Sequence, residues 1–195
     1  ITDGGDLRVT GAAALVGGYD MQAVIDDNTP IYVTDETPNA ENHYRGRFYF
    51  DPNAITMASG DIYSLFTGHL ANGAYAFAVQ LRYILGTGYQ LDAGILTDSN
   101  TWSFTGWYTI TDATHYIEID WDASSAAGAN DGLLALWIDG VQKGNLTGLD
   151  TDTRQVDRVR LGAVSGIDAG TRGTFYLDAL KSTRISYIGV EGVQA

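Results

Sequence analysis

The sequence lacks several features that often reveal what a protein does. It contains no cysteine, which excludes disulfides, thiolate metal sites and a cysteine nucleophile. Only 11 lysines and arginines stand against 24 acidic residues, so the formal charge is −13. A field of that sign repels phosphate backbones and anionic lipids, and we therefore expect no nucleic-acid partner and no membrane insertion. No apolar run approaches the roughly 18 residues that a membrane-spanning helix needs.

The chain is long and hydrophobic enough to form one hydrophobic core. The chain has 195 residues, of which 45% are hydrophobic, and this favours a single folded domain. We expect that domain to span residues 1–189, and the composition of 190–195 is typical of a tail or linker. The N-terminal stretch ITDGGDLRVTG lacks the basic and apolar regions of a signal peptide. The stretch is typical of a mature protein or of a segment of a longer one, and we expect a module of a larger surface or secreted protein, located outside the cell.

Hydrophobic residues recur at every second position in most of the chain, which predicts β-strands. The 24 glycines suit the tight turns that join short strands, and no long helical stripe occurs. We predict an all-β fold, an antiparallel β-sandwich of the jelly-roll type. The expected strands are Ile31–Thr34, Arg45–Phe50, Tyr75–Leu85, Tyr89–Thr97, Tyr116–Trp121, Leu133–Asp139, Val156–Val164 and Thr174–Leu180.

One hairpin and one loop are also predicted. Asp139-Gly140 stands between LLALWI and VQKGNLTG, and an Asp-Gly pair favours a type I′ turn because both central residues need positive φ. The stretch Ala123–Asn130 (ASSAAGAN) is more typical of a loop than of a helix.

Four stretches of the middle and C-terminal parts form a pattern. They are His115–Asp122, the Gly-x-Leu-x-Leu-Trp hairpin Asp131–Gly140, Arg160-Leu-Gly162 and Gly173–Ala179. Together they resemble the concanavalin A-like and laminin-G-like jelly rolls, over roughly residues 44–188. The resemblance implies the sandwich fold but not one function, because these families include lectins, glycan-binding modules, adhesion domains and glycosidases.

Three carboxylates, Glu118, Asp120 and Asp122, share one face of a predicted strand. They resemble the Glu-x-Asp-x-Glu strand of laminarinase-type glucanases, but Asp122 stands where that family has its acid/base glutamate. Positions i and i+4 lie about 13 Å apart along a strand, whereas a retaining pair needs carboxyls about 5–5.5 Å apart. We therefore expect no enzyme, with a glycoside hydrolase as the less favoured alternative. In this interpretation the core receives Ile117, Ile119 and Trp121.

Alternation also suggests a carbohydrate-binding face. Planar and polar side chains interleaved with alanines suit sugar recognition, and those on the predicted outward positions are Arg47, Tyr49, Gln80, Arg82, Asp92 and Trp137. The alternative is a solvated surface or a sheet covered by a further layer. Trp102 and Trp107 in a short polar segment form a second possible platform, unless Trp107 closes one end of the core.

The resemblance further implies a structural calcium ion with an aspartate on the final strand, which is Asp178 here. Carboxylate partners for such a hard cation are available near the N-terminus, where Asp20 and Asp26 (or Asp27) lie.

These observations favour a non-catalytic, extracellular, lectin-like module that binds a glycan or polysaccharide and holds structural calcium. The alternative from another class is an adhesive module that associates with copies of itself or with neighbouring domains.

Overall fold

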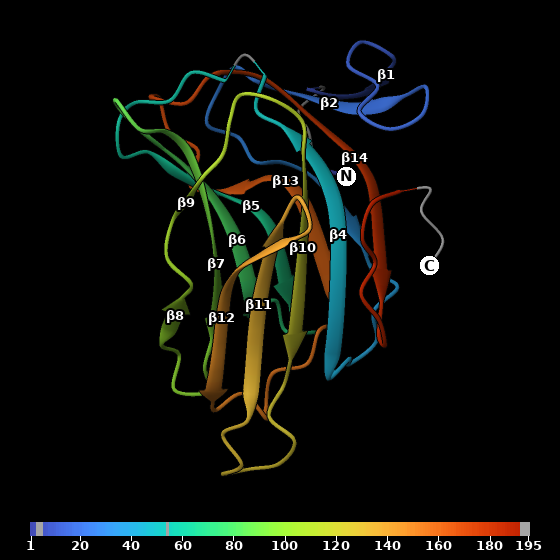
Figure 1. The fold of residues 1–195 in the computed structure, drawn as a ribbon, viewed down its shortest axis with the longest axis vertical. Helices are drawn as coiled ribbons and strands as arrows, with labels where there is room; N and C mark the ends of the chain where they lie inside the picture. Colours follow the sequence, from blue (N-terminus) through green and yellow to red (C-terminus); the bar gives the residue numbers. More distant parts are fainter. Residues whose placement is uncertain (3–5, 54, 192–195) are drawn as a thin grey trace.

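The computed structural model describes residues 1–2, 6–53 and 55–191 and contains two antiparallel sheets packed face to face (Figure 1). The first, which we call the β4 sheet, has the strand order β1 (Leu7–Thr10), β2 (Asp20–Ile25), β14 (Gly173–Thr183), β4 (His43–Asp51), β10 (His115–Asp122), β11 (Gly132–Ile138), β12 (Val141–Leu149).

The second sheet, called the β6 sheet, has the order β3 (Ile31–Asp35), β13 (Arg158–Ser165), β5 (Ile62–His69), β6 (Tyr75–Ile84), β7 (Gly88–Leu96), β8 (Trp102–Phe104), and β9 (Tyr108–Thr109) also pairs with β7. Figure 1 shows β4, β10, β11 and β12 lying in front of β5, β6, β7 and β13. The predicted antiparallel jelly-roll sandwich is confirmed. The described residues contain no helix long and apolar enough to cross a membrane.

The core lies between the two sheets and is rich in aromatic rings. Phe77 of the β6 sheet contacts Tyr44 and Trp121 of the β4 sheet, with ring centroids 5.9 and 6.3 Å apart. Phe48 reaches across to Phe66 at 5.2 Å. These side chains are fully buried, and each removes a large apolar surface from water at roughly 25 cal/mol per Å². Interdigitated rings therefore fix how the two sheets face each other.

Every predicted strand is present, and the predicted hairpin is confirmed by its backbone. Asp139 and Gly140 have φ values of 52° and 77°, as a type I′ turn between β11 and β12 requires. The stretch 123–130 is a loop, as expected.

Strands that the sequence did not predict are β1, β2, β5, β8 and β9. The informative case is β5, which lies in the middle of the β6 sheet. An irregularity between Ser64 and Phe66 places the consecutive residues Leu65 and Phe66 both in the core, so strict alternation is lost.

The chain does not leave the domain at residue 190. After β14 it turns back, and residues 185–191 run beside β14 and β4 (Figure 1). Glu191 contacts both Arg47 and Tyr49, so the predicted tail or linker lies against the domain at this residue. Residues 192–195 lie outside the described part.

Candidate functional site

The residues predicted to form one carbohydrate-binding face lie on two opposite faces of the sandwich. Gln80, Arg82 and Asp92 belong to β6 and β7 and point outward from the β6 sheet. Arg47, Tyr49 and Trp137 belong to β4 and β11 and point outward from the β4 sheet. Since the inner faces of the two sheets pack against each other, no single surface contains both groups.

The outer face of the β4 sheet is already occupied by residues 185–191. Arg47 and Glu118 beneath them are fully buried. The Glu118 carboxylate accepts hydrogen bonds from the backbone N–H groups of Ile188 and Gly189, each at 2.9 Å. Glu118, one of the three carboxylates considered for catalysis, is therefore hydrogen-bonded by the chain itself.

The other two carboxylates of that strand are also paired. Asp120 bonds the ring of His43 at 2.6 Å and the guanidinium of Arg45. Asp122 lies 3.7 Å from the other ring nitrogen of His43. Ile117, Ile119 and Trp121 are buried in the core, as predicted.

The outer face of the β6 sheet carries rows of polar side chains across four strands. Cross-strand register places Ser165, Ser64, Gln80 and Asp92 side by side on β13, β5, β6 and β7. On one side of this row Arg82 pairs with Gln90, and on the other Arg160 pairs with Thr67. We call this surface the Asp92 face; its residues are Ser64, Thr67, Gln80, Arg82, Gln90, Asp92 and Arg160.

Aromatic rings border the Asp92 face near β8. Trp102 and Phe104 stack with centroids 5.5 Å apart and an interplanar angle of 18°. They lie over Gly94, where a Cβ atom would come within 2.4 Å of the Phe104 ring. This glycine is therefore required by the close approach of the ring. Trp102 also contacts Tyr75 edge-on at 5.8 Å.

Two further aromatic rings, at other edges of the Asp92 face, each stack against the guanidinium of an arginine. The guanidinium of Arg82 lies 4.1 Å from the centroid of Trp107, and that of Arg160 lies 4.8 Å from Tyr32. Arg82 also donates from Nε to Gln90 at 2.9 Å. Stacking holds both cations, and a hydrogen bond also fixes Arg82, so the face presents oriented positive charge in a chain whose net charge is negative. Trp102 and Trp107 therefore border this face, beside Gln80, Arg82 and Asp92.

Asp92 is the unusual group of this face. Its side chain is only 2% exposed, and its Oδ1 atom is buried with no hydrogen-bond partner among the described residues. Burial raises the pKa of Asp92 to about 7, and the nearby positive charge of Arg82 opposes that rise. A carboxyl that titrates near neutral pH can both take and release a proton, as a general acid or base must.

His69, at one end of the same face, is less available for proton transfer. Its Nδ1 donates to the carbonyl of Gly73 at 3.1 Å, and its Nε2 accepts from the Thr67 hydroxyl at 2.9 Å. Burial lowers the pKa of His69 to about 4, and the charges of Arg160 and Arg158 act in the same direction. The imidazole is therefore neutral and locked at neutral pH. Its ring packs 4.6 Å from that of Tyr75.

Tyr75 brings a hydroxyl to the central row. Tyr75 is the cross-strand partner of His69. Its hydroxyl lies 3.4 Å from Oγ of Ser165, which in turn pairs with Ser64. Alternation alone does not reveal this residue, because Tyr75 stands in the same alternating positions as the core residues Phe77 and Val79. An irregularity between Gly68 and His69, seen only in the pairing of β5 with β6, is what turns it outward.

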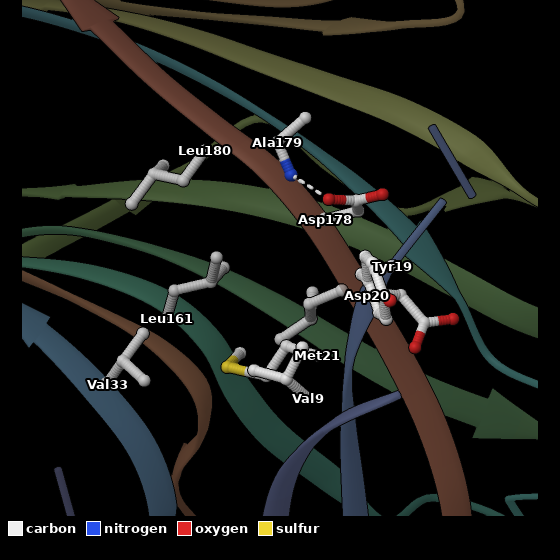
Figure 2. Close-up of a pocket in the computed structure, with 10 residues that line it drawn as sticks. Val9, Tyr19, Asp20, Met21, Val33, Leu161, Asp178, Ala179 and Leu180 are labelled. Carbon is white, nitrogen blue, oxygen red and sulfur yellow. Dashed lines mark hydrogen bonds between the residues drawn. The ribbon is translucent and has the colours of Figure 1, made fainter. Parts of the chain in front are cut away.

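Two of the three predicted calcium ligands lie close together. Asp20 and Asp178 are on the paired strands β2 and β14, one position beyond the pair Met21–Leu177. Asp26 follows the opposite end of β2 and does not join them. The two carboxylates border a largely apolar pocket of about 280 Å³ and point away from its apolar side chains (Figure 2).

The carboxylates of Asp20 and Asp178 are mostly satisfied by backbone amides. Asp20 Oδ2 accepts from the N–H groups of Ala13 and Ala14, at 3.0 and 2.7 Å. Asp178 accepts from Val16 at 2.8 Å and from Ala179 at 2.6 Å. Only Asp20 Oδ1 lacks a partner within the described ranges. Ca²⁺ takes six to eight oxygen ligands, of which these two carboxylates would supply a part, and the calcium site stays a prediction.

No family model and no characterised protein matches the sequence, but solved structures resemble the fold. An endo-β-1,4-glucuronan lyase from the fungus Trichoderma reesei has a TM-score of 0.68 at 11% identity, covering 92% of this chain and 87% of its own. An alginate lyase from a Chlorella virus has a TM-score of 0.64 at 13% identity, covering 92% and 89%. Botulinum neurotoxin type C, studied for its interaction with two ganglioside molecules, has a TM-score of 0.64 at 8% identity, covering 95% of this chain but 43% of its own.

These TM-scores show a shared fold, and the names of the similar structures overturn one prediction. We expected a non-catalytic binding module and no enzyme. That prediction is wrong, because the similar structures that match over nearly their full length are polysaccharide lyases. The jelly-roll part of the resemblance is confirmed at the level of an antiparallel sandwich.

Proposed function

We propose that this protein is a polysaccharide lyase, which cleaves an anionic polysaccharide of uronate units by β-elimination on the Asp92 face. The observation that carries the proposal is the buried carboxyl of Asp92, whose pKa is raised to about 7, on the outer face of the β6 sheet near Arg82, which Trp107 and Gln90 hold in place. The substrates in the names of the similar enzymes, glucuronan and alginate, are uronate polymers and support the substrate class.

The chemistry of elimination matches the groups on this face. A base must remove the proton from the carbon next to the uronate carboxylate, and a cation must neutralise that carboxylate so the proton becomes acidic. The bond from the neighbouring carbon to the glycosidic oxygen then breaks, a carbon–carbon double bond forms, and the leaving oxygen takes up a proton. Proton transfers of this kind are most efficient when the catalytic group titrates near the working pH.

We assign these roles to two residues. Asp92 in its ionised form removes the proton and then returns it to the leaving oxygen, and Arg82 binds the uronate carboxylate. Arg82 suits its role because its guanidinium is always charged and is oriented by Trp107 and Gln90. The stacked rings of Trp102 and Phe104 provide a planar surface for a further sugar unit of the polymer.

The test is an assay of the purified chain on alginate and glucuronan, with a neutral β-glucan as the control substrate. Elimination produces a double bond conjugated to the carboxylate, which is followed by ultraviolet absorbance. We expect product from a uronate polymer and none from the glucan. No absorbance change on any uronate polymer, or reducing ends released without the double bond, contradicts the proposal.

Three further expectations belong to this proposal. A polymeric substrate agrees with a location outside the cell. Membership of the concanavalin A-like families stays a prediction carried by the sequence pattern alone. Self-association likewise stays a prediction.

A further inference from the structure

Arg160 is an arginine without an anionic partner, on the same face as Asp92. Its guanidinium lies 4.8 Å from the centroid of the Tyr32 ring, which holds it on the outer side of the β6 sheet. In the described part of the chain Arg160 forms no ion pair, and its Nε is buried without an acceptor. Its Nη1 and Nη2 are not among the buried nitrogens, so a ligand can reach them.

An unpaired arginine is unexpected in so acidic a chain. There are 24 acidic residues against 11 lysines and arginines, and Arg45 and Arg47 on the other sheet are both paired with carboxylates. Burying a charged donor without a counter-charge is unfavourable. An anion from outside the chain would remove this penalty, and a carboxylate fits the fork of two guanidinium N–H groups.

Arg160 lies far from Arg82, the other cation of this face. Arg160 on β13 pairs with Thr67, and Thr67 pairs with Ala78 on β6. Arg82 stands four residues farther along β6. Two strand spacings of about 4.8 Å and four residues of about 3.3 Å place the two Cα atoms about 16 Å apart.

The two guanidinium groups also lean toward opposite edges of the sheet. Arg160 stacks on Tyr32 of β3, the strand at one edge, and Arg82 stacks on Trp107, in the loop between β8 and β9 at the other edge. One carboxylate is too small to contact both cations. The two arginines can therefore bind two separate carboxylates of a polymer that carries one on each unit.

The row that contains Gln80 and Asp92 lies between the two arginines. Arg82 stands on one side of this row and Arg160 on the other. A polymer that reaches from one arginine to the other must cross the row, where the proposed base lies. A polymer that ran parallel to the strands would meet only one of the two cations.

We propose that Arg160 binds the carboxylate of a second uronate unit, different from the unit bound by Arg82, and that the polymer crosses the strands of the Asp92 face. The inference deepens the proposed function and rests on it for the class of ligand, a polymer of uronate units. Arg160 then contributes to the binding of long chains and not to that of fragments too short to reach it.

The test measures binding rather than turnover. Asp92→Asn is the common background, so that the polymer is not consumed, and calorimetric titration compares this chain with the same chain carrying Arg160→Gln as well. The probes are alginate, glucuronan and a uronate disaccharide. We expect Arg160→Gln to weaken binding of a polymer by about tenfold, the loss of one charge-assisted pair, and to leave binding of the disaccharide unchanged.

Three controls separate a carboxylate contact from other effects. Lys143→Gln removes the same charge from an exposed position on β12 of the other sheet and should leave polymer binding unchanged. Arg160→Lys keeps the charge but loses the fork and the stacking, so its binding should be intermediate. A polymer whose carboxylates have been reduced to alcohols should bind equally to the chains with Arg160 and with Arg160→Gln.

Two outcomes overturn the inference, provided that the variant keeps its cooperative thermal transition. One is equal binding of the polymers with and without Arg160→Gln. The other is an equal loss for the disaccharide and the polymer, which would place both arginines on one unit. Elimination activity together with either outcome leaves the proposed lyase standing without this subsite. Polymer binding that depends on Arg160 without any elimination leaves the subsite standing and rejects the lyase.

Discussion

Asp92 on β7 is the direct cross-strand partner of Gln80 on β6, and both side chains lie on the outer face of the same sheet. The pairing places a carboxyl, buried with one oxygen unpartnered in the described structure, beside an amide that can bind a sugar hydroxyl. A group left unsatisfied in this way lowers stability, and proteins retain such groups mainly where they function. The first predictions therefore concern Asp92.

Asp92→Asn should abolish elimination while leaving the fold intact, because an amide of the same shape cannot accept the substrate proton. We expect at least a hundredfold loss in kcat on a uronate polymer, in the range that a general base contributes. Asp26→Asn, which changes an exposed carboxylate outside this face, is the matched control and should retain full activity. Undiminished turnover by Asp92→Asn would remove Asp92 from the mechanism.

The pH dependence of activity follows from the role of Asp92 as a base. Its pKa is about 7, so the active ionised form becomes populated as the pH rises through neutrality. We expect kcat/KM to increase up to about pH 7 and then to level off, in a profile measured on a short soluble oligouronate. A profile that falls over the same range would assign Asp92 the role of the acid instead.

The same raised pKa predicts how Asp92 affects stability. Below the ordinary pKa of 3.8 the carboxyl is protonated in the folded and unfolded states, so Asp92→Asn should change little. Between pH 3.8 and about 7 the unfolded state releases its proton first, and the wild-type fold loses stability relative to the variant. Above pH 7 the variant should be more stable by up to about 4 kcal/mol. Denaturant titrations of both chains at pH 4 and pH 8 measure this difference.

His69 should make the fold sensitive to acid. Its pKa is about 4 in the folded state and near 6.5 when unfolded, so the unfolded state takes up a proton first as the pH falls. Stability should therefore decrease from pH 6.5 to 4, with a contribution of up to about 3 kcal/mol. Since glutamine can still donate to Gly73 and accept from Thr67, His69→Gln should fold and should remove this part of the slope. An unchanged slope in the variant would assign the acid sensitivity to other groups.

Gly94→Ala should weaken substrate binding more than it slows the reaction. A Cβ atom at this position meets the Phe104 ring at 2.4 Å and therefore displaces the ring from its stack on Trp102. Phe104 is partly exposed and can move, so the fold should survive. We expect KM for the polymer to rise severalfold with kcat nearly unchanged. Gly18→Ala, where a Cβ meets nothing within 4 Å, is the control.

The sequence alone predicts the strands whose two faces differ in burial. The residues Phe77, Val79 and Leu81 of β6 alternate with Ala78 and Gln80, and the strand was predicted within one residue of its observed end. The β5 strand was missed because Leu65 and Phe66 both enter the core at an irregularity. Such irregularities depend on pairing with another strand, and local periodicity carries no trace of them.

In the candidate site, too, local periodicity predicts which way a side chain points but not which sheet it belongs to. Alternation correctly predicted that Gln80, Arg82 and Asp92 point outward, but it placed Arg47 and Trp137 on the same surface. The strands of Arg47 and Trp137 belong to the other sheet, since β4 pairs with β14 and β10, which lie far along the chain. Sheet membership is decided by long-range pairing, and a single sequence without that pairing cannot place two outward faces relative to each other.

The loop that precedes β2 should keep its structure without the expected calcium ion. Four backbone amides already bond the carboxylates of Asp20 and Asp178. Because these bonds hold the loop without a cation, we expect excess chelator to leave Tm unchanged, and added Ca²⁺ to leave it unchanged as well. Asp178→Asn should lower the free energy of unfolding by about 1–3 kcal/mol, since an amide is a weaker acceptor for the N–H of Val16. A Tm that rises with Ca²⁺ concentration would instead show preferential binding of the ion to the folded state, and it would support the calcium site that the sequence predicted.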